Sequence, residues 1–587
     1  DVKFFGATSG NYMLWDESED SLDVVGDLDV DGGTIKLDGN YPTGTNNVAL
    51  GDTALDTVEA GGNYNVAIGH AALTALTTGD SNVAVGWSAG TAVTTGSQNT
   101  FVGGSQTNGA GVAVTDGTYN TFIGLDAGGA TTTASNNTAV GADALTANTT
   151  ADNNTAVGFE ALKDNTTGTV NTAMGRQSLQ NNTTGDGNTA YGHNSLNTVT
   201  TGDCNTAVGG SALFNSTADN NTAVGNNAMA ATTTGYCNIS VGRCALASNT
   251  DGYSNTVVGT GALKTNTGGD KNVAIGREAL GVSTTANSNT SIGFDSLQAN
   301  TTGGVLVAVG AQALFSNTTA SNNTAVGLDA LYYNTTGCCN SSLGGCTLKD
   351  NSTGERNNAF GYRALQNHTT GCDNNAFGTN SLATITTGCY NTAAGSASLY
   401  ATTTGNGNTA MGMCALAGNT TAANNTSIGN GSMEANTTGA SNVAVGGTAL
   451  DANTEGDDNV AVGVAALSAA TTADANTAVG HRSLLVTTTA NNNTAVGRDA
   501  LCSNTTGSAN TAIGIQAGDM VTTGDNNLLL GNSAGIDAMI QVSTADHQIV
   551  VGNNTHTNAT IKIDWTVTSD LRDKTEIKNV THGLDFV

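Results

Sequence analysis

Proline, aromatic residues and charged residues are all scarce in this sequence. It contains 1 proline, 4% aromatic residues and 11% charged residues, whereas glycine is abundant at 78 residues. A glycine-rich disordered chain usually also carries proline, serine and charge. The composition therefore predicts a regular but unusual architecture, and it argues against both a disordered linker and a series of ordinary globular domains.

Basic residues are the scarcer of the charged groups. The chain has 17 Lys and Arg against 47 Asp and Glu, which gives a formal net charge of −30. Nucleic acids and anionic membrane surfaces bind clustered Lys and Arg, so neither is an expected partner. No apolar run approaches the roughly 20 residues that span a bilayer, so membrane insertion is not expected. A carbohydrate or a protein stays open as a partner.

A 17-residue unit of the form NTAVGxxALxxNTTGxx fills most of the chain. The glycine that closes each NTAVG-like pentad, called the anchor glycine below, recurs at Gly124 and Gly141 and then in unbroken steps of 17 from Gly225 to Gly531. One step, from Gly209 to Gly225, is 16 residues long. Self-similarity at a fixed period is the sequence signature of a repeat architecture.

Each position of the unit has its own chemistry. The residue before the anchor glycine is apolar, as in Val140, and the fourth residue after it is leucine, as in Leu145. The short β-branched pentad predicts a strand, and the Asn-Thr-Thr-Gly remainder predicts turns. Seventeen residues are too few for helical-hairpin repeats. We therefore predict an all-β protein, a parallel β-solenoid or β-roll of about 29 coils, with two strands per coil and both apolar residues pointing inward.

Two large inward-facing residues per coil make a thin core for one chain. We therefore expect three chains to share a core in a homotrimeric fibre. The expected parts are an N-terminal β collar at 1–45, the repeat shaft at 46–535, a C-terminal β transition at 536–568 and a chaperone-like segment at 569–587. Near the shaft ends Gly90, Gly128, Gly518 and Gly535 replace the leucine, as terminal repeats commonly depart from the consensus.

The C-terminal sequence TSDLRDKTEIKNVTHGLDFV, residues 568–587, resembles the start of the endosialidase-type intramolecular chaperone domain of bacteriophage tail fibres and tailspikes. In that family the domain drives trimer assembly and is then released by autoproteolysis between a Ser and an Asp. The resemblance places this bond at Ser569–Asp570 and the family's essential lysine at Lys574. It implies single-turnover self-cleavage, and no other catalysis is expected.

The pentad NVAIG, at residues 65–69 and 272–276, is similar to the repeats of trimeric autotransporter adhesin heads, although their units are shorter. That resemblance implies a trimeric, adhesive, left-handed β-roll. Together the observations predict a tail-fibre shaft located in the virion. Its expected partners are further copies of itself, other tail proteins at the N-terminus, and a glycan or protein receptor on the host surface. The alternative is a cellular trimeric adhesin or an extracellular filament at the cell surface.

No residue pattern indicates an enzyme of the ordinary kind, a cofactor or a metal site. His70, His193 and His481 each follow an anchor glycine but lie in coils far apart, and the nearly unbroken period leaves no room for an inserted catalytic domain. Asp143, Glu160 and Asp329 follow anchor glycines and are expected to project as solvated side chains. The collar sequence Asp27–Gly32 has calcium-loop spacing, but its flanks are strand-like rather than helical, so we predict no metal there.

The ten cysteines are expected to be free thiols. Cys372 and Cys389 occupy the same position in consecutive coils, which would bring them within disulfide reach. A fibre assembled in a reducing cytoplasm would nevertheless keep them reduced. No CxxC pair and no histidine cluster offers the spacing of a zinc site.

Overall fold

The computed structural model describes residues 2–5, 12–16, 21–25, 44–536 and 542–555, in two units that divide between Arg356 and Asn357. All regular elements in these residues are β-strands. Within the same residues, no helix is long and apolar enough to cross a membrane.

The first unit contains strands β1 to β21. Their bounds are β1 Val2–Phe5, β2 Tyr12–Asp16, β3 Ser21–Val25, β4 Val48–Leu50, β5 Val66–Ile68, β6 Val83–Val85, β7 Thr100–Val102, β8 Thr121–Ile123, β9 Thr138–Val140, β10 Thr155–Val157, β11 Thr172–Met174, β12 Thr189–Tyr191, β13 Thr206–Val208, β14 Thr222–Val224, β15 Ile239–Val241, β16 Thr256–Val258, β17 Val273–Ile275, β18 Thr290–Ile292, β19 Val307–Val309, β20 Thr324–Val326 and β21 Ser341–Leu343.

The second unit contains strands β22 to β33. Their bounds are β22 Asn358–Phe360, β23 Asn375–Phe377, β24 Thr392–Ala394, β25 Thr409–Met411, β26 Thr426–Ile428, β27 Val443–Val445, β28 Val460–Val462, β29 Thr477–Val479, β30 Thr494–Val496, β31 Thr511–Ile513, β32 Leu528–Leu530 and β33 Ile549–Val551.

The first three strands form a small antiparallel sheet in the order β1-β2-β3. In its register Val2 lies opposite Trp15 and Tyr12 lies opposite Val25. This sheet falls within residues 1–45, the segment in which the sequence predicts a collar.

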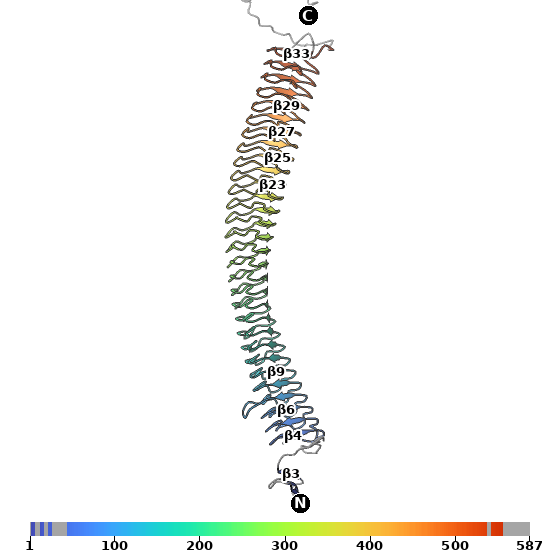
Figure 1. Cartoon of the computed structure of the whole chain (residues 1–587), viewed down its shortest axis with the longest axis vertical. Coiled ribbons are helices and arrows are strands. Elements are labelled where there is room, and N and C mark those ends of the chain that lie inside the picture. The colour runs from blue at the N-terminus through green and yellow to red at the C-terminus, as the bar shows by residue number, and fades with distance from the viewer. Residues whose placement is uncertain (1, 6–11, 17–20, 26–43, 537–541, 556–587) are drawn as a thin grey trace, which may run out of the picture. The chain divides into compact units, whose positions relative to one another are not determined.

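From β4 onward, each strand within a unit pairs in parallel with the next one, in register. Thr138 pairs with Thr155, and Thr155 pairs with Thr172, so equivalent positions 17 residues apart lie side by side. In Figure 1 the strands of each unit follow one another along the same side of their stack. The predicted parallel β-solenoid with a 17-residue period is confirmed. The prediction of two strands per coil is wrong, because each coil has one three-residue strand and closes through turns.

From β5 onward, the middle residue of each solenoid strand is buried inside the coil. Ala139 is fully buried, whereas Thr138 and Val140 on either side of it are only half-buried. This alternation is the period of two that an extended strand imposes. The prediction that the apolar residue before the anchor glycine lines the core is therefore wrong. That residue points outward, and alanine takes the inner position.

The predicted leucine column does lie in the core, in an unexpected backbone conformation. Leu145 and Leu162 are fully buried and have φ angles of 57° and 50°. A left-handed conformation costs an L-residue roughly 1–2 kcal/mol. Burial of the leucine side chain, worth about 2 kcal/mol, offsets this cost. The backbone N–H of Leu145 also donates to the carbonyl of Ala161 in the next coil at 2.9 Å.

Two columns of buried asparagine complete the core. In the first column, the side chain of Asn154 is fully buried and out of reach of water. Its backbone N–H donates to Asn137 Oδ1 at 2.8 Å, and its Nδ2 donates to the carbonyl of Gly168 at 2.9 Å. In the second, Asn165 Nδ2 donates to Asn148 Oδ1 at 3.1 Å and to the same Gly168 carbonyl at 2.9 Å. Buried amides are tolerated when such bonds satisfy them.

The core therefore closes within one chain. Its leucine, alanine and asparagine side chains are fully buried without any other copy present. The expectation that three chains share one core does not describe this arrangement. Any partner copy has the outward-facing side chains to pack against, not the inner ones.

Leu306 interrupts the first asparagine column and so provides a test of how much this column stabilises the coils. Its N–H donates to Asn289 Oδ1 at 2.9 Å, but its side chain cannot accept the next bond. In the described residues the backbone N–H of Asn323 has no acceptor. Restoring the column with Leu306→Asn should stabilise these coils by about 1 kcal/mol.

The measurement is hydrogen exchange at the Asn323 amide. Exchange should slow in Leu306→Asn and should not slow in Leu306→Ala, which lacks the acceptor. Equal protection of the Asn323 amide in the two variants would show that the asparagine side chain at position 306 does not stabilise this coil.

Candidate assembly face

The outward side chains of the solenoid strands form one continuous surface in each unit. We call this surface the strand face; it consists of the first and third residues of β4–β21 in the first unit and of β22–β33 in the second. In-register pairing places each of these side chains directly beside its counterpart in the next coil. Two parallel columns of side chains result.

The third-residue column of the strand face is aliphatic or aromatic in every strand from β4 to β33. Its larger members are substantially exposed, for example Leu343 at 47% and Phe377 at 45%. Phe360 and Phe377 stack across consecutive coils with ring centroids 5.1 Å apart. The first-residue column is mostly threonine and valine. A contiguous exposed apolar surface of this kind marks an interaction site in soluble proteins.

The strand face carries no charge. No strand from β4 to β33 has Asp, Glu, Lys or Arg at its first or third position, although the chain contains 47 acidic and 17 basic residues. Within the described coils, residues 44–536 and 542–555, the charged residues therefore lie in the turns and corners. A neutral, apolar face on an acidic chain is the place where two copies can approach with the least repulsion.

Many of the acidic residues lie at the corner that precedes the strand, six residues before the anchor glycine. There a side chain accepts the backbone N–H of the equivalent residue in the preceding coil. Thr169 donates to Asp186 at 2.6 Å, Asp186 donates to Asp203 at 2.8 Å, and Asp203 donates to Asp219 at 2.9 Å. This coil-to-coil bond was missed from the sequence. The signal was present, because Asp, Asn, Ser or Thr recurs at that position.

The carboxylates that follow anchor glycines form hydrogen bonds and ion pairs, whereas the sequence predicted that they would be solvated. Glu160 accepts from Lys163 Nζ at 2.7 Å and from Gln177 Nε2 at 2.8 Å. These bonds, the one from Lys163 above all, lower the pKa of the Glu160 carboxyl. Asp329 pairs with Lys349 at 3.0 Å. Glu160 and Asp329 are therefore hydrogen-bonded side chains on the flank of the coil rather than freely solvated groups. Asp143, at the position equivalent to Glu160 in the preceding coil, is half-buried.

All ten cysteines lie in the described residues, and all are free. Cys389 Sγ accepts the backbone N–H of Cys372 at 3.1 Å, the same coil-to-coil bond that aspartate makes elsewhere. Cys338 and Cys339 are adjacent, with a sulfur–sulfur distance of 3.5 Å. The hydrogen bond with Cys339 and burial raise the pKa of the Cys338 thiol to about 11, so this thiol is a poor nucleophile.

The described part of the chain holds no group of three or more His, Cys, Asp or Glu side chains placed to bind a metal ion. His70 lies at the surface and stacks on Trp87 with centroids 4.6 Å apart. Among the histidines in the described part of the chain, His368 is the exception because it is fully buried, at a position that asparagine usually occupies.

The sequence-predicted self-cleavage residues Ser569, Asp570 and Lys574 lie outside the described residues, as does the segment Asp27–Gly32. Comparison with protein families, with curated proteins and with solved structures finds no match. The strand face is therefore the main functional candidate, and its chemistry is that of a binding surface.

Proposed function

We propose that this chain is the shaft of a homotrimeric attachment fibre of the bacteriophage tail-fibre class, and that its copies pack through their strand faces. The observation that carries the proposal is the uncharged, exposed apolar column that runs through every solenoid strand of each unit. Such a fibre connects a virion to a receptor on the host surface.

The strand face is large enough for a stable interface. In the first unit, successive strands about 4.8 Å apart extend roughly 80 Å, and a three-residue strand is about 10 Å wide. The face of this unit alone therefore offers on the order of 800 Å² per copy, which matches the area each partner contributes to a standard protein interface.

The C-terminal sequence around Ser569 favours a bacteriophage fibre over a cellular adhesin. The intramolecular chaperone that this sequence resembles acts on trimeric tail fibres and tailspikes, and the adhesin heads that the pentads resemble are trimeric as well. These two resemblances are the reason for three copies rather than two. A cellular adhesin or extracellular filament would use the same strand face for the same packing.

The test combines mass in solution with negative-stain imaging of the full chain. The wild-type protein should have three times the mass of one chain and should image as a fibre. The double variant Val445→Asp/Val462→Asp places two carboxylates on adjacent levels of the strand face, since Val445 pairs with Val462. Burying them between copies is costly, so this variant should be monomeric.

A matched control carries the same added charge elsewhere. Thr438→Asp/Thr472→Asp alters exposed turn positions, where the equivalent residue of another coil is already Glu455. It should remain trimeric. A monomeric wild-type protein would rule out the trimer, and a trimeric Val445→Asp/Val462→Asp variant would rule out the strand face as the interface.

A further inference from the structure

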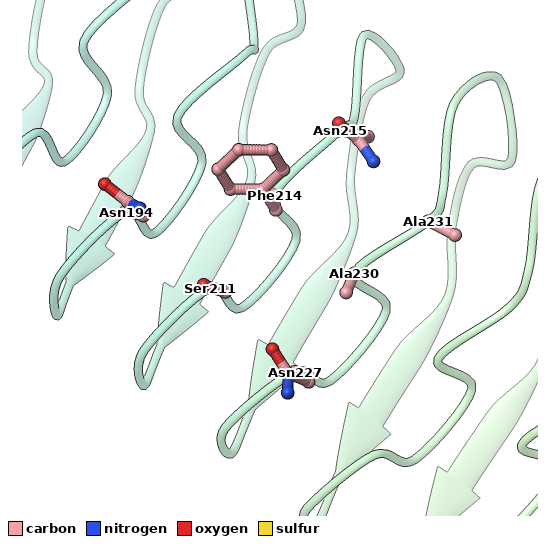
Figure 2. Close-up of a pocket in the computed structure, with 7 residues that line it drawn as sticks. All are labelled: Asn194, Ser211, Phe214, Asn215, Asn227, Ala230 and Ala231. Atoms are coloured by element: carbon pink, nitrogen blue, oxygen red, sulfur yellow. The ribbon is translucent and has the colours of Figure 1, made fainter.

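The single 16-residue step of the repeat coincides with a hollow on the flank of the first unit. Between β13 and β14 the register advances by 16 residues, from Thr206 to Thr222, because the coil lacks one turn residue. Beside this coil lies a hollow of about 410 Å³, lined by residues from three consecutive coils, as Figure 2 shows. The lining residues follow the strands and do not belong to the strand face.

Phe214 provides a partly exposed aromatic ring in this hollow. It lies five residues after its anchor glycine, as Phe315 does in another coil. The residue at the same position of the coil after Phe315 is Tyr332, whose ring stacks on Phe315 with centroids 5.0 Å apart and planes 6° apart. After Phe214 the corresponding residue is Ala230, which is too small to cover the ring. Figure 2 labels Phe214 in one coil and Ala230 in the next.

Uncharged polar side chains surround the Phe214 ring. Asn194, Ser211 and Asn227 occupy the same position in three consecutive coils, two residues after the anchor glycine. Within the described residues, none of the three side chains makes a hydrogen bond, and Asn194 Oδ1 is a buried oxygen without a partner. The lining contains no acid and no base, although the same position elsewhere holds charged residues such as Glu160.

We propose that this hollow binds a neutral sugar residue of a short glycan chain. One face of a pyranose ring presents C–H groups, which suit the flat apolar surface of Phe214. Its hydroxyls both donate and accept hydrogen bonds, as the amides of Asn194 and Asn227 and the hydroxyl of Ser211 do. A pocket volume of this size is ordinary for small ligands. Because the lining is uncharged and the chain carries −30, an acidic sugar is disfavoured.

The proposal does not depend on how many copies assemble, and one substitution tests it directly. Ala230→Tyr should stack on Phe214 as Tyr332 stacks on Phe315, which fills the hollow with a residue that the fold already accepts at this position. The probes are maltotriose, mannotriose and chitotriose, with trigalacturonate as the acidic comparison. Binding to the full chain is followed by saturation-transfer NMR and by calorimetry.

At least one neutral trisaccharide should bind the wild-type chain, and Ala230→Tyr should weaken it at least about tenfold, the loss expected for an aromatic contact. The matched control is Ala417→Tyr, at the equivalent position of the second unit, which should leave the affinity unchanged. The proposal is overturned if no neutral probe binds, if trigalacturonate binds more tightly than all of them, or if Ala230→Tyr retains wild-type affinity.

Discussion

Replacing the anchor glycine Gly446 with alanine is expected to open the coils around it, at a cost above about 3 kcal/mol. Gly446 has a φ angle of 138°, a conformation that is essentially restricted to glycine. A methyl group there would lie 2.5 Å from the carbonyl oxygen of Gly463 and 2.6 Å from its carbonyl carbon. Both atoms belong to the backbone of the next coil, so the clash can be relieved only by separating the two coils.

The neighbouring glycine supplies the control. A methyl group on Gly447 would meet nothing closer than the Asn430 carbonyl oxygen at 3.9 Å, and Gly447 has no positive φ angle. Gly447→Ala should therefore be close to neutral. Because solenoids open locally rather than all at once, the readout is hydrogen–deuterium exchange, peptide by peptide. Fast exchange should be confined to peptides around β27 and β28 in Gly446→Ala, and equal exchange in the two variants would contradict the prediction.

Acidification should destabilise the second unit through His368. Burial lowers the pKa of this histidine to about 4, from 6.5 in an unfolded chain, so the folded state holds it neutral. As the pH falls from about 6.5 towards 4, the unfolded chain takes up a proton that the folded chain does not. Above pH 6.5 His368 does not reduce the free energy of unfolding of the second unit. By pH 4 this free energy should be lower by about 3 kcal/mol.

His368→Asn should remove this loss, because asparagine is the usual residue in its column. The measurement is the urea midpoint of the full chain, followed by circular dichroism at pH 7 and at pH 4.5. His481→Asn, an exposed histidine of the same unit, is the matched control and should keep the wild-type pH dependence. The explanation fails if His368→Asn and the wild-type chain lose the same stability on acidification.

The period and the fold class were predictable because they depend on residues with distinct chemistry. The anchor glycine and the leucine four residues later repeat clearly enough to give the coil length and the position of one core column. The inward and outward sides of the strand were not predictable. A strand of only three residues, such as Thr138–Val140, is too short for the alternation of polar and apolar residues to show which side faces the core. The pattern therefore could not place alanine inside and valine outside.

The burial of the asparagine columns was not predictable, because buried amides are uncommon and their bonds connect different coils. Asn154, for instance, finds its acceptor in a residue 14 positions further along the chain. The hollow beside Phe214 was also invisible in the sequence. It depends on the absence of a large side chain at Ala230, and a small residue carries no signal until its neighbours in space are known.

The asparagine and aspartate bonds described above connect each coil only to the coils next to it, and nearly every coil makes the same set. Deleting or duplicating one whole 17-residue unit would join two surfaces that already fit each other. Each deletion or duplication would change the length of the solenoid by about 4.8 Å and leave its core unchanged. A gene built this way can adjust the length of its product by recombination between repeats, in whole steps, without having to evolve a new fold.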